Sequence, residues 1–101
     1  MIVPFGHVIV LSALLFLIGA ACAASRRNLI MIVLGVEIML NAVGLAMVGA
    51  SLHWNRVDGQ VFVIFVMAVA AAEVAVGLAL IVRAQKRTGS LDPNVYDTLK
   101  D

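Results

Sequence analysis

The chain has 101 residues, of which 63% are hydrophobic and 13% are charged, and its formal net charge is +1. A soluble domain is nearer half apolar, with about a quarter of its residues charged. The composition therefore excludes an ordinary water-soluble domain, indicates a chain embedded in a lipid bilayer, and gives no reason to expect a nucleic-acid partner.

Three apolar runs, at residues 2–24, 29–52 and 61–82, are long enough to cross the hydrocarbon core, which takes about 20 helical residues. Their hydrophobicity is continuous rather than alternating, which indicates helices and not barrel strands. The connections are short, so neighbouring helices must be antiparallel. The sequence predicts an all-α integral membrane protein with three transmembrane helices, in a single membrane domain over 1–101 that includes a cytoplasmic tail at 83–101.

The first run is not expected to be a cleaved signal peptide. It lacks a positively charged segment before the apolar stretch, and its basic pair follows that stretch instead. The segment IGAAC at 18–22 faintly resembles a lipoprotein cleavage site, but Gly19 stands where a larger apolar residue is expected.

Cysteine and histidine give no sign of a metal or cofactor site. Cys22 is the one cysteine, so an internal disulfide and a cysteine-based metal site are both excluded. His7 and His53 are far apart in the sequence and have no metal-binding spacing. We expect both histidines at a membrane–water interface, and no metal or cofactor in this chain.

The basic residues predict the orientation of the helices. One cluster, Arg26 and Arg27, lies between the first two runs, and a second follows the third run: Arg83, Lys86 and Arg87. A three-span chain places both clusters on the same side, and the positive-inside rule makes that side cytoplasmic. The expected topology has the N-terminus outside and the C-terminus in the cytoplasm, with His53 and Trp54 at the outer interface, where aromatic rings collect.

The tail has one recognisable helix-start signal, with Asp92 as an N-cap and Pro93 at the first helical position. Val95, Tyr96 and Leu99 would then share a face of a short helix docked on a partner. The alternative is a frayed terminus, and the sequence favours neither.

The second and third runs each contain one glutamate, Glu37 and Glu73. Glu37 follows Asn28 by nine residues, and Glu73 precedes Arg83 by ten. At about 1.5 Å per residue, both carboxyls lie roughly 13–15 Å inside a core about 30 Å thick. The counting predicts two carboxyls near the midplane, at matched depth on antiparallel helices.

These glutamates oppose insertion but do not prevent it. An acidic residue at the centre of a span costs about 2.5–3.5 kcal/mol, and each Leu, Ile, Val or Phe contributes about 0.3–0.6 kcal/mol in favour. The run at 29–52 has twelve such residues, which favour insertion by roughly 4–7 kcal/mol. Because ionisable residues inside membranes mark ion or proton pathways, we interpret Glu37 and Glu73 as proton carriers.

The simpler alternative is that each glutamate is a neutral glutamic acid that only hydrogen-bonds a neighbouring helix. The matched depth of Glu37 and Glu73 weakens this alternative. Asn41 lies one turn after Glu37 and shares its face with Gly44, so Asn41 is expected to orient the carboxyl or hold a water. Ala70 and Gly77 flank Glu73 and favour close helix packing. Three helices enclose little interior, so we expect both glutamates to open onto neighbouring subunits.

The segments GVEIMLNAVGL at 35–45 and AAAEVAVGLAL at 70–80, with the basic loop SRRN at 25–28, resemble the three-helix K-subunit family of proton-pumping NADH:quinone oxidoreductase, respiratory complex I. The resemblance covers nearly the whole chain. A related subunit of multisubunit sodium/proton antiporters shares the three-helix plan, but the segment at 70–80 looks like the complex I version.

The resemblance implies that Glu37 and Glu73 match the family's two membrane glutamates, which belong to a chain of ionisable residues and waters. That chain links the quinone-reduction end to the antiporter-like subunits. Arg26 and Arg27 match the family's basic cytoplasmic loop. The implied neighbours are the J-type subunit and the first antiporter-like N-type subunit, with the A- and H-type subunits nearby. One departure is Gly44, where the family often has a second asparagine.

The resemblance also implies that FMN, iron–sulfur clusters and quinone belong to the complex as a whole and not to this chain. The implied location is a bacterial inner membrane rather than a mitochondrial one. Two other functions stay open from the residues: a small proton-coupled exporter or antiporter component, and a purely structural packing subunit. In the structural case, bulky changes at Ala71 or Gly77 would disrupt assembly while glutamine at both glutamates would leave activity intact.

Overall fold

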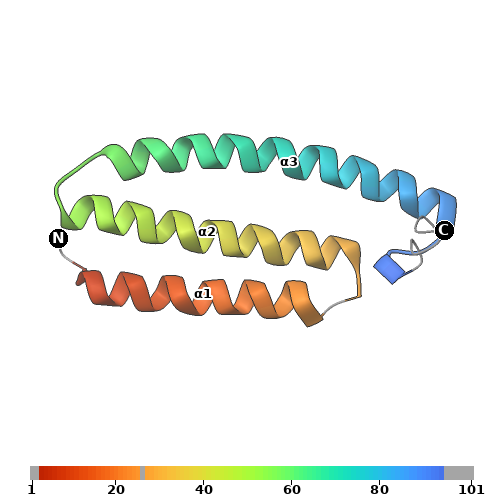
Figure 1. Ribbon diagram of the computed structural model, residues 1–101, viewed down its shortest axis with the longest axis horizontal. Coiled ribbons are helices and arrows are strands. Elements are labelled where there is room, and N and C mark those ends of the chain that lie inside the picture. Colours follow the sequence, from red (N-terminus) through yellow and green to blue (C-terminus); the bar gives the residue numbers. More distant parts are fainter. Residues whose placement is uncertain (1–2, 26, 95–101) are drawn as a thin grey trace.

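Three helices lie side by side and alternate in direction in the computed structural model, which describes residues 3–25 and 27–94 (Figure 1). They are α1 (Phe5–Ser25), α2 (Leu29–His53) and α3 (Asp58–Thr88), and the molecule measures 52 × 24 × 21 Å. Each helix is long and apolar enough to cross a membrane. The predicted all-helical fold with three membrane-spanning helices is confirmed, while the side of the membrane on which each terminus lies stays a prediction.

The third helix is longer than its apolar run. We expected it over 61–82, and it begins at Asp58 and ends at Thr88. Its 31 residues extend about 46 Å at 1.5 Å each, well beyond a core about 30 Å thick. Hydropathy marks only the part in lipid, and the arginine, lysine and glutamine after it are good helix formers. Gly89 then ends the helix with φ 75°, a left-handed conformation that glycine adopts without strain.

The start of α2 is held by two hydrogen bonds. The side chain of Asn28 accepts the N–H of Ile30 at 2.9 Å, which satisfies one of the free donors of the first turn. The N–H of Leu29 donates to the carbonyl of Leu91 at 2.9 Å. The segment after α3 therefore returns to the connection between α1 and α2, as a three-span arrangement requires.

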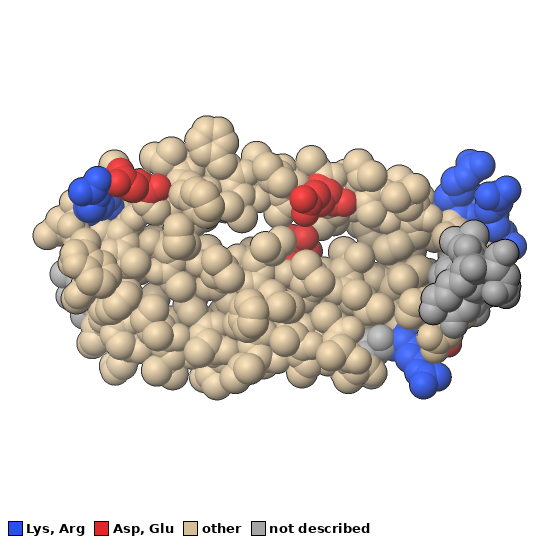
Figure 2. All heavy atoms as spheres, viewed as in Figure 1, with Lys and Arg blue, Asp and Glu red and all other residues tan. Residues whose placement is uncertain are grey.

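That end of the molecule, here called the basic end, carries the described members of both basic clusters (Figure 2): Arg27, Arg83, Lys86 and Arg87. Arg26 lies outside the described residues. The opposite end, here called the loop end, contains the connection between α2 and α3. The clusters thus share one end of the bundle, which is the arrangement from which the cytoplasmic side was predicted.

Helices α1 and α2 approach each other at backbone distance. Gly35, Ala42 and Gly49 of α2 are buried at a spacing of seven residues, and so are Ser12 and Gly19 of α1. A Cβ added at Gly19 would lie 2.6 Å from the carbonyl oxygen of Gly35. Small residues permit this approach, and in lipid such packing replaces the hydrophobic effect as the force that joins helices.

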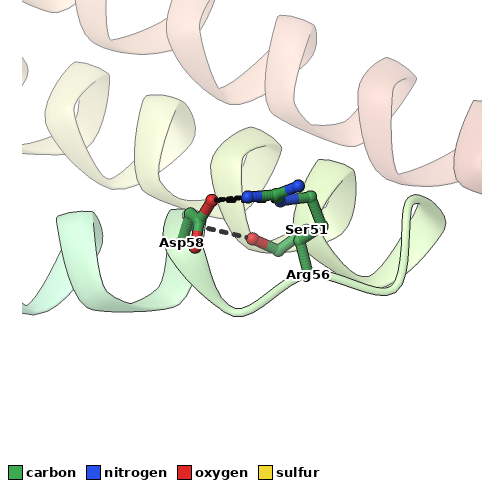
Figure 3. A network of polar contacts seen from close by, with 4 residues as sticks. Ser51, Arg56 and Asp58 are labelled. Atoms are coloured by element: carbon green, nitrogen blue, oxygen red, sulfur yellow. Dashed lines mark hydrogen bonds and ion pairs between the residues drawn. The ribbon is translucent and has the colours of Figure 1, made fainter.

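Helix α3 is fastened to α2 at the loop end. The hydroxyl of Ser51 accepts the N–H of Gly59 at 2.8 Å, and Arg56 forms an exposed ion pair with Asp58 at 2.6 Å (Figure 3). A Cβ at Gly59 would lie 2.6 Å from the carbonyl oxygen of Met47. The chain can therefore turn closely over the end of α2 only because this position has no side chain.

In the tail, the carboxylate of Asp92 accepts the N–H of Asn94 at 2.9 Å, which is the capping bond expected of it. Val95, Tyr96 and Leu99, which the sequence placed on one face of a docked helix, lie outside the described residues.

Candidate functional site

Glu37 and Glu73 line the same cavity between α2 and α3. Its volume is about 190 Å³, and apolar residues and one glycine form the rest of its wall: Ile32, Val33, Val36, Val74 and Gly77. The two carboxyls come from antiparallel helices, and Figure 2 shows acidic atoms near the middle of the molecule, away from the basic atoms at either end. The structure thus brings together the two residues that counting along the sequence had placed at one depth.

The two carboxyls differ in exposure. Glu37 is half-buried between the helices, whereas Glu73 is exposed on the surface of α3. Within residues 3–25 and 27–94, neither carboxyl has a hydrogen bond or an ion pair. A charged or polar group in contact with lipid tails is costly, so the face of α3 around Glu73 requires protein or water over it.

Asn41 lies beside Glu37 on the wall of a second and larger cavity of about 440 Å³. This cavity also separates α2 from α3, and an opening between the two helices is visible beside the acidic atoms in Figure 2. Asn41 is exposed and has no hydrogen-bond partner in the described part of the chain. Its amide is therefore available to a water or to a group outside the chain.

Gly44 and Ala70 also line the larger cavity. A Cβ at Gly44 would meet only the side chain of Val63, at an ordinary 3.6 Å, so the glycine widens the cavity without being required by close packing. Ala70 is buried, as expected of a small residue on the face of Glu73. Among the described residues, Gly77 has nothing within 4 Å of an added Cβ, so the close packing expected around it is not made by this part of the chain.

The basic loop is not part of this site. Arg27 is exposed at the basic end, ten positions before Glu37, which corresponds to roughly 15 Å along a helix. Arg27 therefore does not contact the glutamates. Any influence it has on them acts through the orientation of the chain in the membrane or through the electric field of its guanidinium charge.

An aromatic cluster at the loop end was only partly foreseen. The ring of His53 stacks on Phe5 with centroids 4.5 Å apart, and Trp54 meets both rings edge-on. His53 and Trp54 were predicted to share an interface, but Phe5 was not included. The contact of Phe5 with these rings could have been predicted, because antiparallel packing places the start of α1 beside the end of α2.

Ser12 was also missed. Its hydroxyl is buried against α2 and has no partner within the described residues. In the same part of the chain, no group of three or more His, Cys, Asp or Glu side chains is placed to hold a metal ion.

Comparison with the sequences of known proteins places this chain in a family. The family model for NADH-ubiquinone/plastoquinone oxidoreductase chain 4L matches residues 7–101. The NADH-quinone oxidoreductase subunit K 2 of Syntrophobacter fumaroxidans is 60% identical over 99% of this chain and 88% of its own length. Subunit K of Syntrophotalea carbinolica is 54% identical over 99% of both chains, and that of Nitrosospira multiformis is 47% identical over 97% of this chain and 96% of its own.

These matches extend over nearly the whole chain at high identity, which confirms the resemblance carried by the two glutamate segments and favours it over an independent exporter. The chain belongs to the NADH-ubiquinone/plastoquinone oxidoreductase chain 4L family, which contains subunit K of the multi-subunit NADH-quinone oxidoreductase, complex I.

Proposed function

We propose that this chain carries protons between Glu37 and Glu73 within the membrane part of NADH-quinone oxidoreductase, as one section of the relay that couples quinone reduction to proton pumping. The observation that carries the proposal is the cavity of about 190 Å³ that both carboxyls line, in the apolar middle of two antiparallel helices.

The absence of structural bonds to the carboxyls supports a chemical role. A glutamic acid retained only for packing would hydrogen-bond a neighbouring helix, yet neither carboxyl does so within the described chain. Each carboxyl opposes insertion by about 2.5–3.5 kcal/mol, and among residues 3–25 and 27–94 no hydrogen bond or ion pair to either carboxyl offsets that cost. A function in proton exchange explains why both are kept.

Water is the expected intermediary between the two carboxyls. A proton passes between groups within hydrogen-bond reach or through one bridging water. A water occupies about 30 Å³ in the liquid, so the cavity of about 190 Å³ has room for a short chain of them. The carboxyls at its wall supply the polar partners that ordered water needs.

Under this proposal the redox chemistry belongs to other subunits. Flavin, iron–sulfur clusters and quinone are bound elsewhere in the complex, and this chain contributes no redox group. The thiol of Cys22 points to the carbonyl of Met31 at 3.5 Å, so it packs within the α1–α2 pair.

The proposal places the basic end in the cytoplasm, because basic residues are retained on that side, and the membrane is the bacterial inner membrane, in keeping with the bacterial relatives. The exposed face around Glu73 then meets neighbouring membrane subunits, for which we propose the J-type and the first antiporter-like N-type, with the A- and H-type subunits nearby. Covering this face with protein removes a carboxyl from lipid.

The test is proton pumping by the assembled complex in membrane vesicles. Glu37→Gln and Glu73→Gln each remove the exchangeable carboxyl while keeping a similar shape, and each should lower pumping driven by NADH oxidation. Ala75→Gln is the matched control, because it puts the same amide at an exposed position of α3, outside both cavities and on the side of the helix away from Glu73. Normal pumping by both glutamate variants, in complexes of normal composition, would exclude the relay.

A further inference from the structure

Two cavities meet at Glu37 and not at Glu73. Glu37 lines both the cavity of about 190 Å³ that it shares with Glu73 and the cavity of about 440 Å³ that it shares with Asn41. Glu73 lines only the smaller of the two. The two carboxyls therefore have unequal access to the space between α2 and α3, although they lie at the same depth.

The two cavities run in opposite directions along the bundle. The larger one follows α2 from Glu37 to Val48, a rise of about 16 Å toward the loop end at 1.5 Å per residue. The smaller one follows α2 from Glu37 back to Ile32 and reaches Gly77 on α3, toward the basic end. Glu37 lies at the junction between them.

A third hollow continues from the larger cavity to the loop end. Its volume is about 470 Å³, it shares Leu45 and Val48 with the larger cavity, and it reaches Asn55 in the connection between α2 and α3. These hollows lie along successive stretches of α2 from Glu37 to the loop end, and Val3 and Val8 near the start of α1, not α3, complete the wall of the last one. Of the two glutamates, only Glu37 lines the larger cavity on this side of the pair.

The wall of the larger cavity has polar groups at the end nearest the glutamate pair. Glu37 and Asn41 are one helical turn apart on it, and neither has a hydrogen-bond partner within the described residues. Water is retained in a cavity when it finds polar partners, whereas a purely apolar cavity stays dry. Gly44 adds width at the next turn because no side chain fills that position.

We infer that the larger cavity holds water which connects Glu37 to the loop end, and that, through the space between α2 and α3, Glu73 exchanges protons with that end only by way of Glu37. Glu37 is then the access residue of the pair. The part of the inference that concerns protons rests on the proposed relay, whereas the part that concerns water does not.

Cysteine accessibility tests the water directly. Gly44→Cys and Gly77→Cys place one thiol in each cavity, and neither added Cβ meets a close contact within the chain. Both are made in a Cys22→Ala background, in the intact complex in sealed vesicles, and treated with a small charged methanethiosulfonate reagent from the loop side. Labelling of this chain is then read by mass spectrometry.

Labelling of Gly44→Cys from the loop side, together with much slower labelling of Gly77→Cys from that side, supports the inference. An unreactive Gly44→Cys would overturn it, because lipid or a neighbouring helix would then fill the larger cavity. Equal labelling of both cysteines from the loop side would also overturn it, because Glu73 would then have its own access.

Filling the larger cavity tests the proton path. Gly44→Leu should reduce pumping toward the level of Glu37→Gln, while Ala75→Leu, which adds the same bulk outside the cavities and on the side of α3 away from Glu73, should not. Normal pumping by assembled Gly44→Leu complex would overturn the access path while leaving the relay intact. The opposite result is also informative. If Gly44→Cys is labelled but both glutamate-to-glutamine variants pump normally, the larger cavity contains water and the relay is excluded.

Discussion

Glu37 of α2 and Glu73 of α3 line one cavity from helices that run in opposite directions. The chain connects them only through the loop end, so their meeting depends on how α3 returns along α2. Because the two carboxyls share one space and no other carboxyl of the described residues lines it, they are expected to act on one proton path.

The double variant tests whether the path is shared. General acid–base groups contribute typically about 10²–10⁴-fold to a rate, so each single glutamine substitution should reduce pumping strongly. If both act in series, Glu37→Gln/Glu73→Gln should be no worse than the more severe single variant, since residues that act as a unit are not additive. Losses that multiply in the double variant would show that the carboxyls serve separate paths.

The contact between Gly19 and Gly35 should be intolerant of any added carbon. A Cβ at Gly35 would lie 2.6 Å from the carbonyl oxygen of Gly19 and 2.7 Å from the nitrogen of Ala23. Gly35→Ala should therefore push α1 from α2, with a destabilisation of about 1–3 kcal/mol, as for other overpacked cores. Gly6→Ala is the control, because nothing lies within 4 Å of its added Cβ.

The measurement for this pair is the amount of the chain that remains in the purified complex after mild heating. Gly35→Ala should be lost at a lower temperature than Gly6→Ala and the wild-type chain. Equal retention of Gly35→Ala and Gly6→Ala would show that α1 and α2 are held together by neighbouring subunits rather than by this contact.

Ser51 should matter more than the ion pair beside it. Ser51→Ala removes the acceptor of the Gly59 N–H and leaves that donor in a partly buried position, which costs about 1–3 kcal/mol. Arg56→Ala breaks an ion pair whose side chains are 67% and 68% exposed, and such pairs contribute about 0–1 kcal/mol. A greater heat sensitivity of Arg56→Ala than of Ser51→Ala would contradict this ranking.

The N-cap at Asn28 can be tested with one variant that removes the capping hydrogen bond and a second that keeps it. Asn28→Ala should destabilise the start of α2 by about 1 kcal/mol, whereas Asn28→Asp keeps a side-chain oxygen for the Ile30 N–H and should retain most of the stability. Protease sensitivity at the basic end of the intact complex measures the effect. Equal cleavage of both variants would mean that the hydrogen bond from Leu29 to Leu91 holds this turn without the cap.

The sequence was sufficient for the number of helices and for the matched depth of the two glutamates, because apolar length and helical rise fix both. It did not predict the ends of α3, since Asp58 and the residues from Arg83 to Thr88 extend the helix beyond its apolar part. Nor did it predict that Glu37 is half-buried while Glu73 is exposed. That difference in exposure depends on how far α3 is displaced from α2. The periodicity of either helix does not predict this displacement.

The cavities themselves were beyond the reach of sequence reasoning for the same reason. Asn41 and Gly44 were correctly placed on the face of Glu37, but the wall that faces them comes from α3, at residues such as Val63 and Ala70. The close contact at Gly59 and the hydrogen bond from Ser51 set where α3 begins beside α2. Residues outside the site thus help determine the space beside Glu37.

The most direct test of the central claim is proton pumping per NADH oxidised in sealed vesicles, compared between Glu37→Asp and Glu37→Gln. Aspartate keeps an exchangeable carboxyl at the junction of the two cavities, and glutamine keeps the polarity without it. A proton relay through Glu37 predicts substantial pumping with aspartate and a severe loss with glutamine. Equal and normal pumping by the two variants would contradict the relay.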